Sequence, residues 1–139
     1  MQIDDIILNK VSSIKKCVER AKQEHREACA VGAKEFMENF SRQDAAVLNI
    51  LRACEQAIDL ANHIVRLKNL GVPNEARDSF DFLVKAEVIS EMLAKKLKEM
   101  IGFRNIAVHE YESVNIAIVQ AVILKDIDDL LEFCAVVLS

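Results

Sequence analysis

The chain is poor in the residues that make turns. Its 139 residues contain three glycines and one proline, whereas the two together make up roughly 12% of an average protein. A β-sandwich or barrel needs a turn signal about every eight to twelve residues, so this scarcity excludes one. Disorder is excluded as well, because 52% of the residues are apolar. We therefore predict a single all-α domain that spans residues 1–139.

Long apolar runs and targeting signals are also missing. The richest apolar stretch, residues 116–124, is interrupted by Gln120 and falls short of the roughly 18 residues that a membrane span needs. The first residues are acidic and carry no signal-peptide pattern. We therefore expect a soluble protein of the cytoplasm that does not bind membranes.

The sequence has no disulfide framework and no zinc pattern. Its cysteines show no CxxC pair and no metal-ligand spacing: Cys17, Cys29, Cys54 and Cys134. Each falls on or beside an apolar helical stripe, where a free cysteine behaves as a small hydrophobic residue. We therefore expect reduced structural thiols, no metal and no cofactor.

Positive charge is in deficit, with a formal net charge of −4. Binding of nucleic acid over a whole surface requires Lys and Arg to neutralise many phosphates, so any RNA site must be a local basic patch. The candidate patch lies between residues 91 and 104, where basic residues outnumber acidic ones: Lys95, Lys96, Lys98 and Arg104 against Glu91 and Glu99.

Apolar residues recur at helical spacing in the first half of the chain. One stripe predicts a helix from about residue 4 to 31, with Gly32 as its stop: Ile3, Ile7, Val11, Ile14, Val18, Ala21 and Ala28. Residues 33–40 are predicted to be a connector with one short turn. Ser41 and Asp44 predict a capping box that opens a second helix, which ends at Gly71 after running to about Leu70.

Three further helices are predicted. A short one lies around residues 74–83, and Ser90 caps a fourth that continues through Gly102, with four residues inward: Leu93, Leu97, Met100 and Ile101. The last segment, about residues 114–137, starts β-branched and apolar, so periodicity alone also permits a strand. Its length and acidic second half favour a helix that is buried on several sides, partly against a second copy of the chain. The predicted architecture is an antiparallel bundle of four to five helices that dimerises.

The second predicted helix carries a polar stripe beside its apolar one. The stripe covers about 100° at 3.6 residues per turn and consists of Glu55, Asp59, Asn62, His63 and Arg66. Two interpretations stay open: a solvated face with i,i+4 pairs, or the wall of a groove.

One short segment gathers side chains that can carry chemistry. Residues 104–111 contain Arg104, Asn105, His109 and the only tyrosine, Tyr111. Asn105 and His109 are four residues apart and share a helix face, with Arg104 at the edge of that face. Ile101 and Val108 are expected to point into the core and so fix this rotation.

These residue types suit RNA cleavage without a metal. The reaction needs a proton acceptor for the 2′-hydroxyl, a proton donor for the leaving 5′-oxygen and a fixed cation beside the phosphate. An imidazole with an ordinary pKa near 6.5 can serve as acceptor or donor, and a guanidinium matches phosphate geometry. If two chains pair with these segments facing, one histidine can act as base and the other as acid. Taken alone, the spacing also fits a histidine that bonds the carbonyls at a helix end.

Residues 104–111 resemble the R-x4-H-x-Y motif of HepT-type toxins. These are HEPN-superfamily ribonucleases that are paired with a minimal nucleotidyltransferase antitoxin, MntA. The likeness extends over nearly the whole chain, with residues 25–40 the least similar, and is carried by four further segments: residues 49–64, 70–73, 77–80 and 100–103. The resemblance implies an all-α homodimer with its catalytic cleft at the two-fold axis, and an endoribonuclease activity that is independent of metal.

The resemblance also implies roles for individual residues. Arg104 and His109 fall on the catalytic positions, Asn105 supports them, and Tyr111 is the hydroxyl that the antitoxin modifies with AMP. Each added AMP would place a negative phosphate on Tyr111, two residues from His109, where it would repel an RNA phosphate. The implied partners are a second copy of the chain, a nucleotidyltransferase antitoxin and RNA. The resemblance gives no role to the possible cleft wall, which is Glu55, Asp59 and His63.

Two other functions fit parts of the pattern. A non-catalytic helical module that binds or regulates a nucleotidyltransferase needs the bundle and the apolar last helix, but not Arg104 and His109. A metal site would combine Asp59 and His63, at i,i+4 spacing, with His109.

Overall fold

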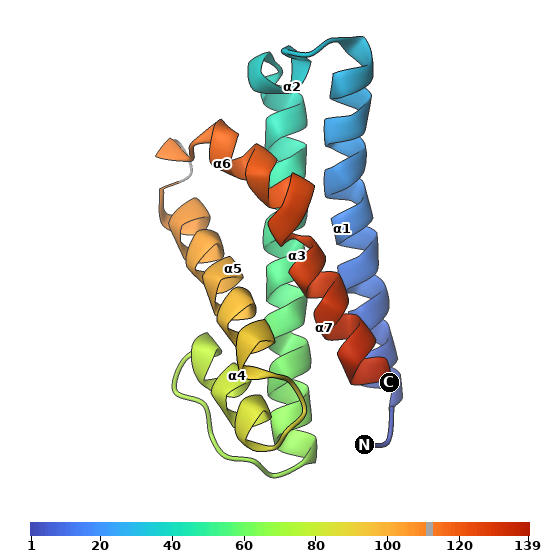
Figure 1. Ribbon diagram of the computed structural model, residues 1–139, viewed down its shortest axis with the longest axis vertical. Coiled ribbons are helices and arrows are strands. Elements are labelled where there is room, and N and C mark those ends of the chain that lie inside the picture. Colours follow the sequence, from blue (N-terminus) through green and yellow to red (C-terminus); the bar gives the residue numbers. More distant parts are fainter. Residues whose placement is uncertain (111–112) are drawn as a thin grey trace.

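The computed structural model describes residues 1–110 and 113–139, which are helical over most of their length and form no β-strand. Two long antiparallel helices, α1 (Asp5–Val31) and α3 (Phe40–Leu67), lie side by side along the longest axis of the molecule (Figure 1). The short helix α2 (Glu35–Glu38) connects them. The all-α fold that the scarcity of turn residues predicts is confirmed.

The other helices cover α3 from one side. Helices α4 (Ala76–Lys85) and α5 (Glu91–His109) flank it, and the chain returns through α6 (Ile116–Ala121). A π-helical turn (Val122–Asp126) leads into α7 (Asp128–Leu138), which crosses α3 obliquely toward α1 (Figure 1). The last predicted segment is thus helical, but a π-helical turn interrupts it. None of the helices in the described ranges is long and apolar enough to cross a membrane.

The core is aliphatic with a few phenylalanines. The inward residues predicted for α1 from Ile7 to Ala28 are buried, and so are the four predicted for α5. Phe80 of α4 packs edge-to-face on Phe133 of α7, with ring centroids 5.6 Å apart. One prediction is wrong: Val108 is 53% exposed, and the neighbouring Ala107 is buried instead. Helix α5 diverges from α3 toward its C-terminal end (Figure 1), so the described part of α3 does not cover Val108 there.

Both ends of α3 differ from the prediction. The side chain of Asn39 accepts a hydrogen bond from the backbone N–H of Arg42 at 3.0 Å, so this residue caps the helix and Ser41 lies inside it. At the other end Asn69 adopts a left-handed φ of 55°, and the N–H of Leu70 bonds the carbonyl of Val65 at 3.0 Å. This Schellman motif ends the helix before Gly71.

Two glycines should respond to alanine in opposite directions. Gly71 has a φ of 148°, and a Cβ there would lie 2.8 Å from the ring of Phe82, so Gly71→Ala should lower the free energy of unfolding by about 1–3 kcal/mol. Gly102 lies inside α5, and its Cβ would meet only the mobile guanidinium end of Arg77, at 3.0 Å. Gly102→Ala should therefore raise the free energy of unfolding by up to about 1 kcal/mol. Urea denaturation measures both values, and a loss of stability in both variants would contradict this account of α5.

Candidate active site

Arg104 lies where the C-terminal half of α5 meets α3. Its Nε is 3.2 Å from Oε1 of Glu55, and the side chains of Arg104 and Glu55 are 21% and 51% exposed. The buried Nε–H makes no aligned hydrogen bond with any described residue, so the contact is an ion pair without the bidentate geometry of a strong one. A phosphate oxygen can therefore compete with Glu55 for this guanidinium.

Asn105 and Arg104 open onto one cavity. The cavity has a volume of about 300 Å³, and its remaining lining comes from the start of α4 and from α5: Glu75, Ala76, Arg77 and Ile101. His109 is the last residue of α5 and is exposed. It lies one turn after Asn105 on the same face of the helix. The geometry thus brings Arg104 and Asn105 to one cavity and leaves His109 open to solvent nearby on α5.

Tyr111 lies outside the described residues. In the sequence it follows His109 by two residues.

The polar stripe of α3 contacts three neighbouring segments, and one of them is α4, where the hydroxyl of Ser79 donates a hydrogen bond to Asn62. Glu55 contacts Arg104 of α5, whereas Asp59 and His63 are engaged by α1. Oδ2 of Asp59 lies 3.4 Å from Nζ of Lys10. Nε2 of His63 lies 2.7 Å from Oδ2 of Asp4, the residue that caps α1. The backbone N–H of Ile7 and, second, the imidazole of His63 hold the pKa of the Asp4 carboxyl below its ordinary value. Of the possible cleft wall, only Glu55 therefore touches Arg104.

The alternative metal site is not assembled in the described ranges. They contain no group of three or more His, Cys, Asp or Glu that could hold a metal ion. Asp59 and His63 are paired with Lys10 and Asp4 instead, and a site built on them with His109 has no geometric support.

The thiol of Cys54 lies beside the candidate site but is not a nucleophile at neutral pH. Burial raises the pKa of Cys54 to about 12, although the positive charge of Arg104 acts in the opposite direction. At neutral pH this thiol is protonated, and only a thiolate is an effective nucleophile. The reactive groups available here are therefore the guanidinium, the amide and the imidazole.

Arg77 is the residue of this region that the sequence does not single out. It comes from α4, remote in sequence from the motif, and lines the same cavity as Arg104. One signal in the sequence could have indicated it. A glycine inside a helix costs about 1 kcal/mol relative to alanine, and at Gly102 the missing side chain leaves room for the guanidinium of Arg77.

Comparisons with known proteins agree with one another. The family model described as ribonuclease HepT-like matches residues 7–137, which include Arg104 and His109. The mRNA nuclease HepT of Shewanella oneidensis is 40% identical to this chain over 135 residues, which are 97% of this chain and 98% of that protein.

Solved structures are similar over the same length. A toxin–antitoxin complex with AMP-PNP contains a chain that matches with a TM-score of 0.88 at 39% identity, covering 97% of this chain and 99% of that one. The structure of a tri-AMPylated Shewanella oneidensis HEPN toxin in complex with MNT antitoxin contains a chain that matches with a TM-score of 0.88 at 40% identity. The match covers 97% of this chain and 98% of that one.

Proposed function

This chain belongs to the HepT-like ribonuclease family, and we propose that it is the toxin of a toxin–antitoxin pair that cleaves RNA through Arg104 and His109 without a metal. The observation that carries the proposal is the position of Arg104. Arg104 follows the buried residues Met100 and Ile101 of α5, its side chain lines a cavity with Asn105, and it pairs with a single half-exposed carboxylate.

The proposed reaction uses only this chain's side chains. Arg104 exchanges the carboxylate of Glu55 for an oxygen of the scissile phosphate, and Asn105 donates to the same group. One imidazole takes the proton of the 2′-hydroxyl, whose oxygen attacks phosphorus. The bond from phosphorus to the 5′-oxygen breaks, and a second imidazole gives that oxygen its proton. DNA lacks the attacking hydroxyl and is not a substrate.

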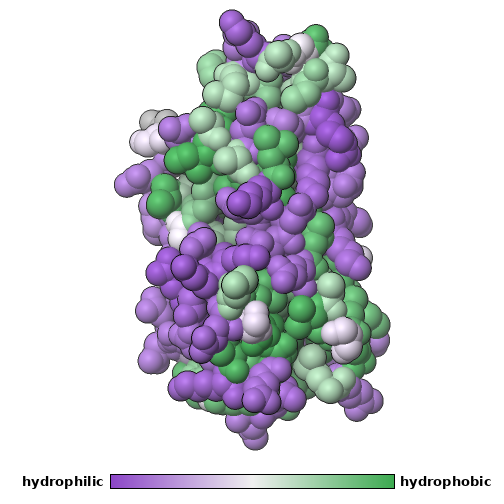
Figure 2. All heavy atoms as spheres, viewed as in Figure 1, coloured by the Kyte–Doolittle hydropathy of each residue, from purple (hydrophilic) through white to green (hydrophobic). Residues whose placement is uncertain are grey.

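We propose that the second imidazole comes from a second copy of the chain. The two other histidines cannot supply it, because His25 and His63 are each only 8% exposed and are engaged by Gln120 and Asp4. Large apolar side chains are exposed near the end of α5, on α6 and in the π-helical turn: Ile106, Val108, Ile118 and Leu124. Figure 2 shows apolar side chains gathered over α6. Such a patch is typical of a protein–protein interface, and pairing through it would bring two copies of His109 to one cleft.

We propose that a nucleotidyltransferase antitoxin neutralises the protein by transferring AMP to Tyr111. A similar solved structure holds a tri-AMPylated toxin in complex with MNT antitoxin, and Tyr111 follows His109 by two residues. Each AMP adds a negative phosphate beside the site that must accept an RNA phosphate, and like charges repel. The RNA substrate and the nucleotide donor are both in the cytoplasm, where we propose that the pair acts.

Replacement of either catalytic residue should abolish most of the cleavage. His109→Ala and Arg104→Ala should each lower kcat/KM by at least about 100-fold, and the wild type should show a bell-shaped pH profile in the presence of EDTA. A fluorescent single-stranded RNA reports cleavage, with Arg20→Ala on the exposed face of α1 as control. Undiminished cleavage by both variants would contradict the mechanism. If the double variant also kept its cellular effect and its partner, the protein would be a non-catalytic binding module.

A charge in the apolar patch should separate the two copies. Ile118 is 53% exposed, and Ile118→Glu should weaken dimerisation by at least about tenfold and lower cleavage at concentrations where the wild type is dimeric. Sedimentation and cleavage are measured in parallel. The matched control is Val72→Glu, at a residue that is 84% exposed in the loop between α3 and α4. A variant that sediments as a monomer and cleaves at the wild-type rate would exclude a shared cleft.

The transfer of AMP should require the hydroxyl of Tyr111. Tyr111→Phe keeps the ring and removes the oxygen that accepts AMP, so the variant should show no AMP mass increments after co-expression with the nucleotidyltransferase. It should still cleave RNA and should remain toxic when the partner is present. Intact-protein mass spectrometry and growth curves measure the two effects. AMP increments that persist on the variant would place the modification elsewhere.

A further inference from the structure

Arg77 is a cation beside the candidate active site. It lies in the first turn of α4 and is exposed, and no described residue forms an ion pair with it. Three other arginines, Arg26, Arg42 and Arg104, each pair with a carboxylate, so what distinguishes Arg77 is its position beside the cavity that Arg104 lines. A guanidinium that lines a cavity and has no carboxylate partner in residues 1–110 and 113–139 can bind an anion there.

The missing side chain of Gly102 in α5 leaves room for the guanidinium of Arg77. The terminal nitrogen of Arg77 lies 3.0 Å from where a Cβ of Gly102 would be, so its guanidinium rests on the backbone of α5 just before Arg104. Arg77, Arg104 and Asn105 line the same cavity of about 300 Å³. This volume lies at the lower end of ligand-sized sites, and Glu75 is the only carboxylate among its lining residues.

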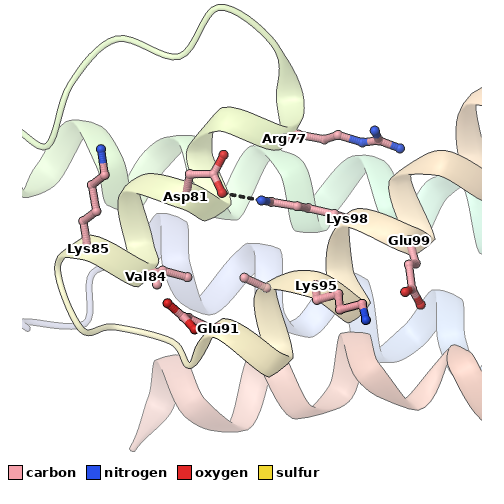
Figure 3. A pocket seen from close by; sticks show the side chains of 9 residues that line it. Arg77, Asp81, Val84, Lys85, Glu91, Lys95, Lys98 and Glu99 are labelled. Atoms are coloured by element: carbon pink, nitrogen blue, oxygen red, sulfur yellow. Dashed lines mark hydrogen bonds and ion pairs between the residues drawn. The ribbon is translucent and has the colours of Figure 1, made fainter.

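A second, larger groove lies between α4 and α5. Arg77 also lines this second cavity, which has a volume of about 680 Å³ and contains Lys95 and Lys98 of α5. Figure 3 shows Arg77 extending from α4 toward α5 at one end of the groove and Asp81 paired with Lys98 farther along.

The lining of the two cavities has a net charge of +1, whereas the whole chain has −4. The basic members are Arg77, Lys85, Lys95, Lys98 and Arg104, and the acidic members are Glu75, Asp81, Glu91 and Glu99.

We propose that Arg77 binds the RNA phosphate next to the one held at Arg104, and that the strand continues from there into the groove past Lys98 and Lys95. This inference rests on the proposed function and adds the path of the substrate to it. A planar guanidinium presents parallel N–H donors to phosphate oxygens, and contacts to phosphates position a nucleic acid without reading its sequence. Arg77 thus adds affinity for a strand and leaves the chemistry to Arg104 and His109.

The test compares a substrate that has one phosphate with one that has several. A dinucleotide offers only the scissile phosphate, whereas an RNA of about ten nucleotides fills a single-strand site. Arg77→Gln should raise KM about tenfold more for the longer RNA than for the dinucleotide, because it removes one charge-assisted contact. With His109→Ala as background, it should also reduce the dependence of log Kd on log salt by about 0.7, the value for one phosphate of a single strand.

Three further variants separate binding from folding. Arg77→Lys keeps the charge without the planar fork and should recover part of the loss. Gly102→Ala displaces the guanidinium of Arg77 without removing it, and should reproduce the selective loss with no decrease in stability. Arg20→Gln removes an arginine of α1 that is likewise exposed and has no ion pair among the described residues, and should behave as the wild type.

The outcomes distinguish the inference from the proposed function. Equal losses on both substrates, no loss on the longer RNA, or the same loss in Arg20→Gln would overturn the inference while cleavage by the wild type stands. If the wild type cleaves neither substrate, the proposed function fails and the inference fails with it.

Discussion

The burial of Met100 and Ile101 against α3 fixes the rotation of α5, and the candidate site depends on that rotation. Both side chains are 3% exposed and share an interior layer with Cys54 and Ile58 of α3. Successive helix residues are about 100° apart, so Arg104 leaves the helix at the edge of the buried stripe, where it meets Glu55. Close-packed interiors tolerate little displacement. The packing thus fixes the backbone of Arg104, while its guanidinium can still bind a ligand.

The three histidines differ in burial and in hydrogen-bond partners, and these differences determine what each can do. His25 packs on Phe36 with ring centroids 5.0 Å apart, and His63 joins α3 to the capping residue of α1. Each holds two helices together and is shielded from substrate. His109 ends a helix that has already diverged from the bundle, where solvent reaches it. One accessible imidazole cannot be acid and base in the same step, so the chemistry and the exposed apolar side chains both favour a second copy.

Sequence patterns predict the middle of each helix better than its ends. Within α1 and α5 each inward apolar side chain packs against many neighbours at once, so the helical periodicity of apolar residues identifies the buried ones. At the start of α3 both Asn39 and Ser41 are residue types that can cap a helix. The backbone of Asn39 is extended and its side chain accepts the N–H of Arg42, which residue spacing alone does not predict. Val108 has the correct periodicity but lies where α5 has left its support. Residues 77–80 take part in the family resemblance, but the sequence gives Arg77 no role, because its approach to Gly102 is a tertiary contact.

The acidic character of the chain accords with control by added negative charge. A strongly basic protein would hold RNA at many points, and a few extra phosphates would change its affinity little. Here the positive charge that faces the cavities exceeds the negative by only one, and Glu55 already opposes Arg104. Near such a balance a few added phosphates are enough to make the net local charge negative. The same small excess of positive charge that would confine RNA to the proposed path would therefore make the proposed modification of Tyr111 an effective switch.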